Sequence, residues 1–238
     1  MKPTLIIDAD DTLWENNIYY EQCTAAFAEL MVAQDFGRDE AGCTVDAVER
    51  ERIPQVGYSP VEFARSLVIA YHRLCERYDR PVEDAVSDAV WEIGRAVLEY
   101  PIVLLDGVSE TLARLSSHCR LLLLTKGDQE AQESKVIRSG LGHHFEAVHI
   151  VPEKDAQVIQ DLVEHYRLRL DKTWMVGNSP RSDINPALEA GIGAVYVPHS
   201  NTWTLEREAI ADPERVMVLK RFEELVTLFL NAERRQGS

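Results

Sequence analysis

Four short apolar runs, each followed at once by a polar cluster, constrain the fold of this 238-residue chain more than any other feature. Short runs rich in apolar residues are typical of strands that are buried on both faces of a parallel sheet. In an open α/β sheet, ligands bind just beyond the carboxyl ends of such strands. The sequence therefore predicts that the four clusters meet at one edge of one sheet. The runs span residues 5–7, 121–124, 148–151 and 174–176, and the clusters span residues 8–13, 125–128, 152–154 and 177–183.

The polar clusters carry groups that suit a phosphate ester and a divalent cation. Asp8 and Asp10 lie two residues apart, so an extended backbone places both carboxylates on the same side. Thr125 adds a hydroxyl after the second run, and Lys154 adds an ammonium after the third. Asp183 supplies a further carboxylate after the fourth run. Together these groups predict a site for a phosphorylated ligand.

In their order along the chain, these motifs resemble those of the haloacid dehalogenase superfamily, in its phosphatase branch. That family's first motif is an apolar strand that runs into Asp-x-Asp-x-Thr, and its second is a strand that ends in Ser or Thr. Its third motif is a Lys, and its fourth is an acidic strand end. One such motif is a weak signal, whereas four in order are specific. The matching residues are Asp8, Asp10 and Thr12, then Thr125, Lys154 and, with one departure from the acidic pattern, Asn178.

The resemblance implies an α/β fold with a Rossmann-like parallel sheet core, helices on both faces, and an inserted all-helical cap. The cap is expected at residues 16–99, because the strand pattern stops there and apolar residues recur at helical spacing. In the family such an insert closes over the phosphate site and selects the substrate. The catalytic core is expected at residues 1–15 and 100–238, with helices at 108–116, 129–139, 156–167, 182–190 and 222–232.

The resemblance assigns the chemistry to the carboxylates of the first motif. Asp8 is expected to be the nucleophile that attacks phosphorus and forms an aspartyl-phosphate. Asp10 is expected to protonate the leaving oxygen and then to activate water. True haloacid dehalogenases expel a halide, which needs no proton, and lack an Asp at the second position, so Asp10 favours a phosphatase. Asp11 is expected to be a solvent-exposed turn residue.

Phosphoryl binding is expected from the second and third motifs. Thr125 would hydrogen-bond a nonbridging phosphoryl oxygen, with the backbone N–H groups of Lys126 and Gly127 nearby. Lys154 would place an ammonium against the phosphoryl group and orient the nucleophile, which stabilises the charge of the transition state.

The resemblance also implies a bound Mg²⁺, a hard cation that prefers oxygen ligands. The expected ligands are the carboxylate of Asp8, the backbone carbonyl of Asp10, and the side chains of Asn178 and Asp183. The family usually has Asp where this chain has Asn178. A neutral amide oxygen still ligates Mg²⁺, but with weaker Coulomb attraction. Either Asn178 or Asp183 could then be the direct ligand of the fourth motif.

The charge balance limits the classes of partner. The formal net charge is −15, which argues against nonspecific nucleic-acid binding, because such binding neutralises phosphates with Lys and Arg. The apolar stretches fall short of the ~20 residues that a membrane span requires. The four cysteines form no Cys-x-x-Cys pair and indicate reduced thiols. We therefore expect a cytoplasmic protein with neither nucleic acid nor membrane as partner.

These inferences predict a Mg²⁺-dependent phosphatase that hydrolyses a small phosphorylated metabolite through an aspartyl-phosphate. Two alternatives stay open. A phosphomutase would return the phosphoryl group from Asp8 to the substrate. A catalytically silent phosphate-binding module would keep the fold, and Asn178 is the feature that supports it. The sequence does not indicate the substrate or the oligomeric state.

Overall fold

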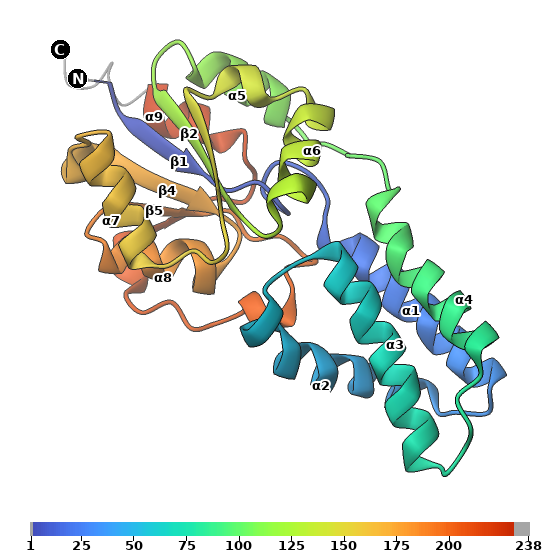
Figure 1. Cartoon of the computed structure of the whole chain (residues 1–238). Helices are drawn as coiled ribbons and strands as arrows, with labels where there is room; N and C mark the ends of the chain where they lie inside the picture. Colours follow the sequence, from blue (N-terminus) through green and yellow to red (C-terminus); the bar gives the residue numbers. More distant parts are fainter. Residues whose placement is uncertain (1, 231–238) are drawn as a thin grey trace. The chain divides into compact units, whose positions relative to one another are not determined.

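The computed structural model describes residues 2–230, and among them a six-stranded sheet forms the centre of one compact unit (Figure 1). The strand order is β3-β2-β1-β4-β5-β6, and the pairings are parallel. The predicted α/β class with a parallel sheet is thereby confirmed. The strands are β1 (Thr4–Ile7), β2 (Arg120–Lys126), β3 (Ala147–Val151), β4 (Thr173–Gly177), β5 (Gly193–Tyr196) and β6 (Val216–Val218).

Alternate residues of each strand point to opposite faces of the sheet, and an apolar cluster forms on each face. Leu5 and Ile7 of β1 pack in one cluster, and Ile6 packs in the other. Helices α5, α6 and α9 cover the first face, while α7 and α8 cover the second (Figure 1). The central strand is therefore buried on both sides. The helices are α5 (Val108–Leu115), α6 (Gln129–Ser139), α7 (Ala156–His165), α8 (Asn185–Glu189) and α9 (Glu224–Leu230).

Four of the five helices expected in the core have different boundaries in the structure. Two of them end slightly early, α5 at Leu115 and α7 at His165, and the other two differ more. The helix expected at 182–190 begins with a π-helical turn, Pro180–Ile184, which α8 follows. In this turn the N–H of Ile184 donates to the carbonyl of Ser179, five residues earlier, at 3.1 Å. Side-chain periodicity does not reveal such a turn, because it differs from an α-helix in its backbone hydrogen bonds. The last helix begins at Glu224 rather than at residue 222, and its expected end at residue 232 lies outside the described residues.

The register of β1 brings the polar cluster that follows it beside those of its neighbours. Ile7 pairs with Leu123 of β2 on one side and with Val176 of β4 on the other. The N–H of Asp8 then donates to the carbonyl of Val176 at 2.9 Å, so the pairing continues into the polar cluster. The carboxyl ends of β1, β2 and β4 therefore meet at one edge, as the sequence predicts.

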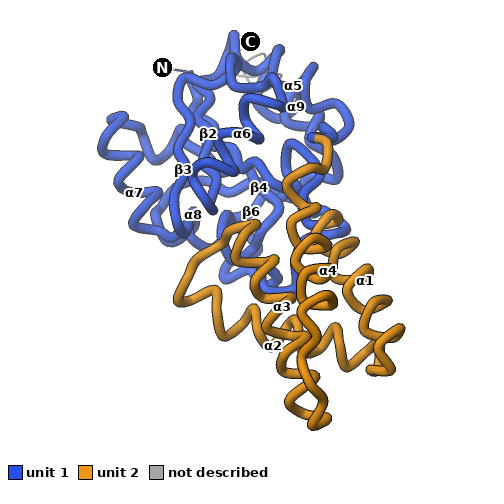
Figure 2. The backbone as a smooth tube through the Cα atoms, turned by 45° about the vertical axis from the view of Figure 1, so that its right-hand side comes forward, with its two compact units in different colours: residues 1–17, 102–238 blue, residues 18–101 orange. Residues whose placement is uncertain are grey.

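The chain divides into two compact units, which Figure 2 shows in different colours. Within the described residues, one unit comprises 2–17 with 102–230 and contains the sheet, and the other comprises 18–101. The second unit is helical and has its own core, which includes Phe27, Leu67 and Val90. Among residues 2–230, none of the helices combines the length and apolarity needed to cross a bilayer. The helices of the second unit are α1 (Asn17–Ala33), α2 (Arg38–Val56), α3 (Pro60–Arg77) and α4 (Asp84–Arg95).

Within the helical unit, α3 and α4 pack closely together at a glycine. A Cβ on Gly94 would lie 2.5 Å from the Cα of Ala64, a distance that real Cβ atoms do not show. The two backbones can therefore pack at this separation only because Gly94 has no side chain.

Candidate active site

Lys154 lies between two carboxylates at the carboxyl edge of the sheet. Its Nζ donates to Oδ1 of Asp8 and to Oδ1 of Asp183, each at 2.5 Å. The three residues are buried, with exposed fractions of 4% for Lys154, 5% for Asp8 and 0% for Asp183. Charge-assisted hydrogen bonds of this kind are short and strong, so one ammonium holds both carboxylates in place.

The pKa of Lys154 shows which protonation state this arrangement favours. Burial alone would favour the neutral amine, but the charges of Asp183 and Asp8 outweigh burial and raise the pKa of Lys154 above its ordinary value. The side chain therefore keeps its positive charge at neutral pH. An ammonium in this position stabilises negative charge on any group that approaches Asp8.

Thr12 connects the first polar cluster with the fourth. Its hydroxyl oxygen lies 2.8 Å from Oδ2 of Asp8 and 3.2 Å from Oδ1 of Asn178. A hydroxyl has one proton, so Thr12 donates to only one of these oxygens at a time. A carboxylate oxygen and an amide oxygen thus converge on one point from β1 and β4. Oxygen donors of this kind are the ligands that Mg²⁺ prefers, and the residues present fit that ion.

The amide of Asn178 is fixed by a contact on the side away from Asp8. Its Nδ2 lies 3.0 Å from the hydroxyl of Thr202, which in turn donates to the carbonyl of His199 at 3.0 Å. Because that carbonyl can only accept, the Thr202 hydroxyl must accept its second hydrogen bond from the amide nitrogen. The amide oxygen is thereby directed towards Thr12. Sequence reasoning missed Thr202, since the loop after β5 carries no local pattern that marks it.

Asp183 is placed by the π-helical turn that follows β4. Its Oδ2 accepts a hydrogen bond from the N–H of Ser179 at 2.9 Å, while Oδ1 faces Lys154. Gly177, at the end of β4, lies directly against this carboxylate, and a Cβ there would be 2.2 Å from Oδ2. The hydrogen bonds of the π-helical turn span one residue more than those of an α-helix. This wider turn and the absence of a side chain on Gly177 together bring Asp183 into contact with Lys154.

In the loop after β2, one of the two backbone groups expected near the phosphoryl site has another partner. The ammonium of Lys126, for which no contact was expected, donates to Oε1 of Glu206 at 2.7 Å. The N–H of Gly127, expected to be available for a phosphoryl oxygen, donates to the carbonyl of Val151 at 2.9 Å. The reason is that hydrogen bonding between β2 and β3 continues to Gly127, which periodicity in the sequence cannot show.

Glu206 is a buried carboxylate that ties the second polar cluster to the fourth. Besides Lys126, it contacts the hydroxyls of Ser179 and Ser182, which both donate to its Oε2 at 2.6 Å. Burial alone would raise the pKa of Glu206, but the charge of Lys126 and the hydrogen bonds outweigh burial and lower the pKa to about 2. Sequence reasoning missed Glu206, because it lies in a loop more than twenty residues after the last motif.

Asp10 is held by donors from its own loop and from α6. Nε1 of Trp14 donates to Oδ1 at 2.7 Å, and Nζ of Lys135 lies 2.9 Å from Oδ1 and 2.8 Å from Oδ2. Nε2 of Gln132 lies 3.0 Å from Oδ2 of Asp10 and 2.8 Å from Oγ1 of Thr125. Sequence reasoning missed Gln132 and Lys135. Their spacing of three residues, on a helix that begins just after Thr125, was the available signal.

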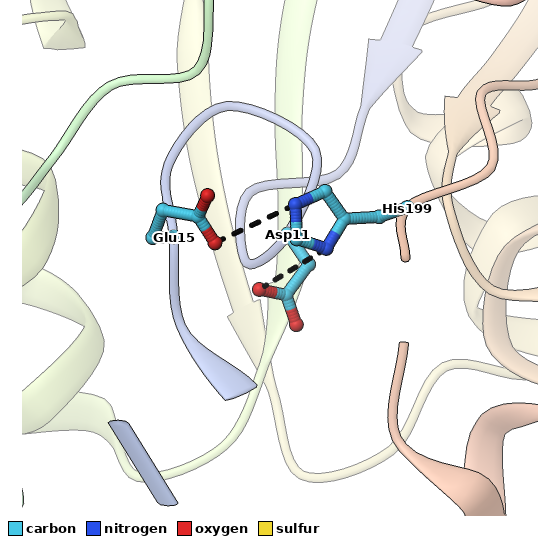
Figure 3. A group of neighbouring side chains, drawn as sticks. All are labelled: Asp11, Glu15 and His199. Carbon is cyan, nitrogen blue, oxygen red and sulfur yellow. Dashed lines mark ion pairs between the residues drawn. The ribbon is translucent and has the colours of Figure 1, made fainter. Parts of the chain in front are cut away.

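Asp11 is buried, in contrast to the solvent-exposed turn residue that the sequence suggests. Its φ of 58° lies in the left-handed region, which Asp adopts more readily than most residues. Its carboxylate accepts hydrogen bonds from the N–H groups of Asn16 and Asn17 at the start of α1, and these donors draw it inward. Figure 3 shows the ring of His199 facing the carboxylates of both Asp11 and Glu15. One ring nitrogen lies 3.9 Å from a carboxylate oxygen of Asp11, and the other lies 3.5 Å from one of Glu15.

A model of haloacid dehalogenase-like hydrolases matches residues 2–191. The chain belongs to this family of hydrolases. The resemblance drawn from the four motifs is therefore confirmed.

Individual relatives support the same family. A phosphoserine phosphatase of Thermus thermophilus is 28% identical over 162 residues, which are 66% of this chain and 55% of that protein, so the chain spans about half of its length. A haloacid dehalogenase-like family hydrolase from Xanthomonas campestris is 28% identical, with a TM-score of 0.80 over 99% of this chain and 95% of the other. A hydrolase of Bacillus subtilis bound to magnesium is 16% identical, with a TM-score of 0.63 over 96% and 98% of the two chains, and shows the fold alone.

In this haloacid dehalogenase-like hydrolase, the predicted site residues form two contact groups: Asp8, Lys154, Asn178 and Asp183 in one, and Asp10 and Thr125 in the other. The contacts run from Lys154 to the carboxylates of the first and fourth motifs, and from Gln132 to the second motif. The side chain of Lys126 and the N–H of Gly127 are directed to other partners. Within each group, every residue contacts another member directly or through one intervening side chain.

Proposed function

We propose that this hydrolase is a Mg²⁺-dependent phosphatase that acts on a small phosphorylated metabolite through an aspartyl-phosphate at Asp8. The observation that carries the proposal is the contact between Asp8 and Lys154. A buried carboxylate with an ammonium 2.5 Å from one oxygen can approach a dianionic phosphoryl group with less repulsion than an isolated carboxylate.

The first step is the transfer of the phosphoryl group to the enzyme. A bond forms between a carboxylate oxygen of Asp8 and phosphorus, while the ester P–O bond breaks. Lys154 neutralises charge on the phosphoryl oxygens, and the hydroxyl of Thr125 donates to one of them. The side chain of Lys126 is assigned no phosphoryl contact, because it already pairs with Glu206.

Asp10 moves the protons in both steps. Its carboxyl gives a proton to the oxygen of the leaving alcohol as the ester bond breaks. The resulting carboxylate then takes a proton from the water that attacks phosphorus, which releases inorganic phosphate and restores Asp8. The dehalogenase reaction needs no such proton, so an Asp at this position favours phosphate esters.

The proposed metal ligands are the carboxylate of Asp8, the main-chain carbonyl of Asp10, and Asn178 and Asp183. The convergence of Asp8 and Asn178 on the Thr12 hydroxyl supports this set. When bound, Mg²⁺ supplies positive charge that screens the repulsion between the nucleophile and the phosphoryl oxygens. The magnesium in the Bacillus subtilis relative agrees with this cofactor.

The substrate class is proposed from the relatives and from the helical insert. The similarity to a phosphoserine phosphatase favours a small phosphomonoester, including phosphorylated amino acids, as substrate. The proposed partner is thus a metabolite rather than a nucleic acid or a membrane. We assign substrate choice to a cap formed by residues 18–101, which is separate in sequence and in packing from the residues of the site.

Phosphate release tests the proposal directly. Wild type, Asp8→Asn and the exposed control Asp161→Asn are compared on an aryl phosphate and a panel of phosphorylated metabolites, with Mg²⁺ or with a chelator. We expect Mg²⁺-dependent release by wild type and the control, and loss of at least about 10³-fold in Asp8→Asn, since the nucleophile itself is removed. Circular dichroism checks that Asp8→Asn is folded. Undiminished turnover in that variant would overturn the mechanism.

The same panel separates the alternatives. Isomerised substrate without free phosphate would support a phosphomutase. Binding of a phosphate analogue without turnover of any compound would support a silent module, and Asn178 would then be the residue to restore.

A further inference from the structure

Helix α6 presents two side chains to Asp10 that the mechanism above does not use. Gln132 and Lys135 are three residues apart and therefore lie on the same face of α6, one turn from each other. Gln132 is buried and Lys135 is largely buried, with 17% of its side chain exposed. The helix begins immediately after the second motif, so its position is fixed by the strand that carries Thr125.

The ammonium of Lys135 has three acceptors within hydrogen-bond distance. Both carboxylate oxygens of Asp10 lie 2.8–2.9 Å away, and Oδ1 of Asn16 lies 2.7 Å away. An ammonium has three protons, so these three contacts use its full donor capacity. Lys135 is therefore engaged with Asp10 and the adjacent loop, and has no further proton for a phosphoryl oxygen in this arrangement.

Gln132 adds a second restraint and links Asp10 to the second motif. Its Nε2 lies 3.0 Å from Oδ2 of Asp10, 2.8 Å from Oγ1 of Thr125 and 2.7 Å from the carbonyl of Lys126. With Nε1 of Trp14 on Oδ1, each oxygen of Asp10 is in contact with two donors. The carboxylate plane of Asp10 is thus fixed from two sides.

We propose that Lys135, assisted by Gln132, is the positioning residue for Asp10 and sets the efficiency of proton transfer to the leaving oxygen. This inference rests on the proposed phosphatase function. When the ester P–O bond breaks, its electron pair goes to the leaving oxygen and the proton of the Asp10 carboxyl neutralises it. Proton transfer requires a donor aligned within hydrogen-bond reach, and a freely rotating carboxyl meets that condition only part of the time.

Substrates with different leaving groups distinguish a role in positioning Asp10 from a purely structural role of Lys135. A p-nitrophenolate leaves readily without a proton, whereas an alkoxide from an alkyl phosphate requires one. Loss of Asp10 positioning therefore penalises alkyl phosphates selectively. General damage to the site, or loss of phosphoryl binding, penalises both substrates alike because both carry the same phosphoryl group.

The experiment measures kcat/KM for p-nitrophenyl phosphate and for the best alkyl phosphate of the metabolite panel. The variants are Lys135→Met, Lys135→Arg, Asp10→Asn and the matched control Arg138→Met, which removes an exposed cation from the same helix. For Lys135→Met we expect a loss of about 10- to 100-fold on the alkyl ester and less than about 3-fold on the aryl ester, since acid catalysis contributes about 10²–10⁴-fold. Lys135→Arg keeps the charge and should recover part of the loss, and Arg138→Met should match wild type.

A double variant tests whether Lys135 acts through Asp10. In the Asp10→Asn background, Lys135→Met should cost no further alkyl ester turnover, because its effect is exerted on a carboxyl that is already absent. Urea unfolding gives a second measure of the coupling. The midpoint of the double variant should fall by less than the sum of the decreases measured for Lys135→Met and Asp10→Asn alone. Equal losses on both esters, or the same loss with and without Asp10, would overturn the inference.

The outcomes also separate this inference from the proposed function. If wild type releases no phosphate from either ester, the proposed phosphatase function fails. The urea midpoints of the single and double variants then decide alone whether Lys135 and Asp10 are coupled. If wild type is active and the decrease in the urea midpoint of the double variant equals the sum of the two single decreases, the proposed function stands and the role of Lys135 is refuted.

Discussion

The carboxylate of Asp183 fills the space where a side chain on Gly177 would lie. A Cβ on Gly177 would fall 2.2 Å from Oδ2 and 2.8 Å from Cβ of Asp183, so the side chain of Asp183 or the backbone at Gly177 would have to move. The same carboxylate makes the 2.5 Å contact with Lys154. We therefore expect any side chain at residue 177 to disturb the contact between Asp183 and the ammonium that faces Asp8.

Gly177→Ala tests this relationship. We expect a loss of about 2–4 kcal/mol in the free energy of unfolding, from overpacking and from the weakened buried ion pair. Urea denaturation measures the loss, and phosphate release measures its effect on the site. The control Gly42→Ala lies in α2 with no atom within 4 Å of the added Cβ, and the higher helix propensity of Ala should stabilise it slightly. Equal behaviour of the two variants would contradict this account.

Thr202→Val should weaken the fixed orientation of the Asn178 amide. Valine has nearly the same shape but cannot accept from Nδ2, so a buried N–H loses its partner at a cost of about 1–3 kcal/mol. The amide can then rotate and present nitrogen rather than oxygen to the proposed metal. We expect a higher Mg²⁺ concentration for half-maximal activity and weaker Mg²⁺ binding by calorimetry. Thr204→Val, at an exposed position in the same loop, is the matched control.

Asn178→Asp should strengthen Mg²⁺ binding, because it adds a negative charge to the proposed ligand set. The hydroxyl of Thr202 can reverse its role and donate to the new carboxylate, so the position remains hydrogen-bonded. We expect the Mg²⁺ concentration for half-maximal activity to fall by several-fold. An unchanged Mg²⁺ dependence would show that residue 178 does not contact the ion.

The contribution of Glu206 to stability should depend on pH. Its pKa in the folded protein is about 2, below the ordinary value of 4.5, so folding favours the charged form. The stabilisation is therefore fully present above about pH 5 and is lost as the pH falls towards 2, with an upper limit of about 3 kcal/mol. The difference in unfolding free energy between wild type and Glu206→Gln should shrink over that range. Glu214→Gln, at an exposed position, should show no such change.

The strands and the motif residues at their ends follow from the sequence because both depend on local patterns. Apolar runs give buried strands, and parallel strands place their carboxyl ends together, which accounts for Asp8, Thr125 and Asn178 at one edge. The division between a sheet unit and a helical unit also coincides with a change in periodicity. These features need no knowledge of side-chain conformation.

The remaining site features depend on contacts between segments distant in the chain. Lys126 and Lys135 are both cations near the second motif, but the ammonium of Lys126 is bound by Glu153, Ser182 and Glu206, which lie far along the chain. Thr202 and Glu206 come from loops without a periodic pattern. The burial of Asp11 depends on donors at the start of α1. Such pairings are set by packing of the completed fold, so local sequence patterns do not specify them.

Because of the π-helical turn at Pro180–Ile184, the contact between Asp183 and Lys154 depends on the number of residues between Gly177 and Asp183. Each residue removed from or added to a helical turn rotates the following side chains by about 100° around its axis. A single deletion there would point the Asp183 carboxylate away from Lys154 while leaving the composition of the motif almost unchanged. In functional relatives, gaps should therefore be least tolerated in this short segment, even where its individual residues differ.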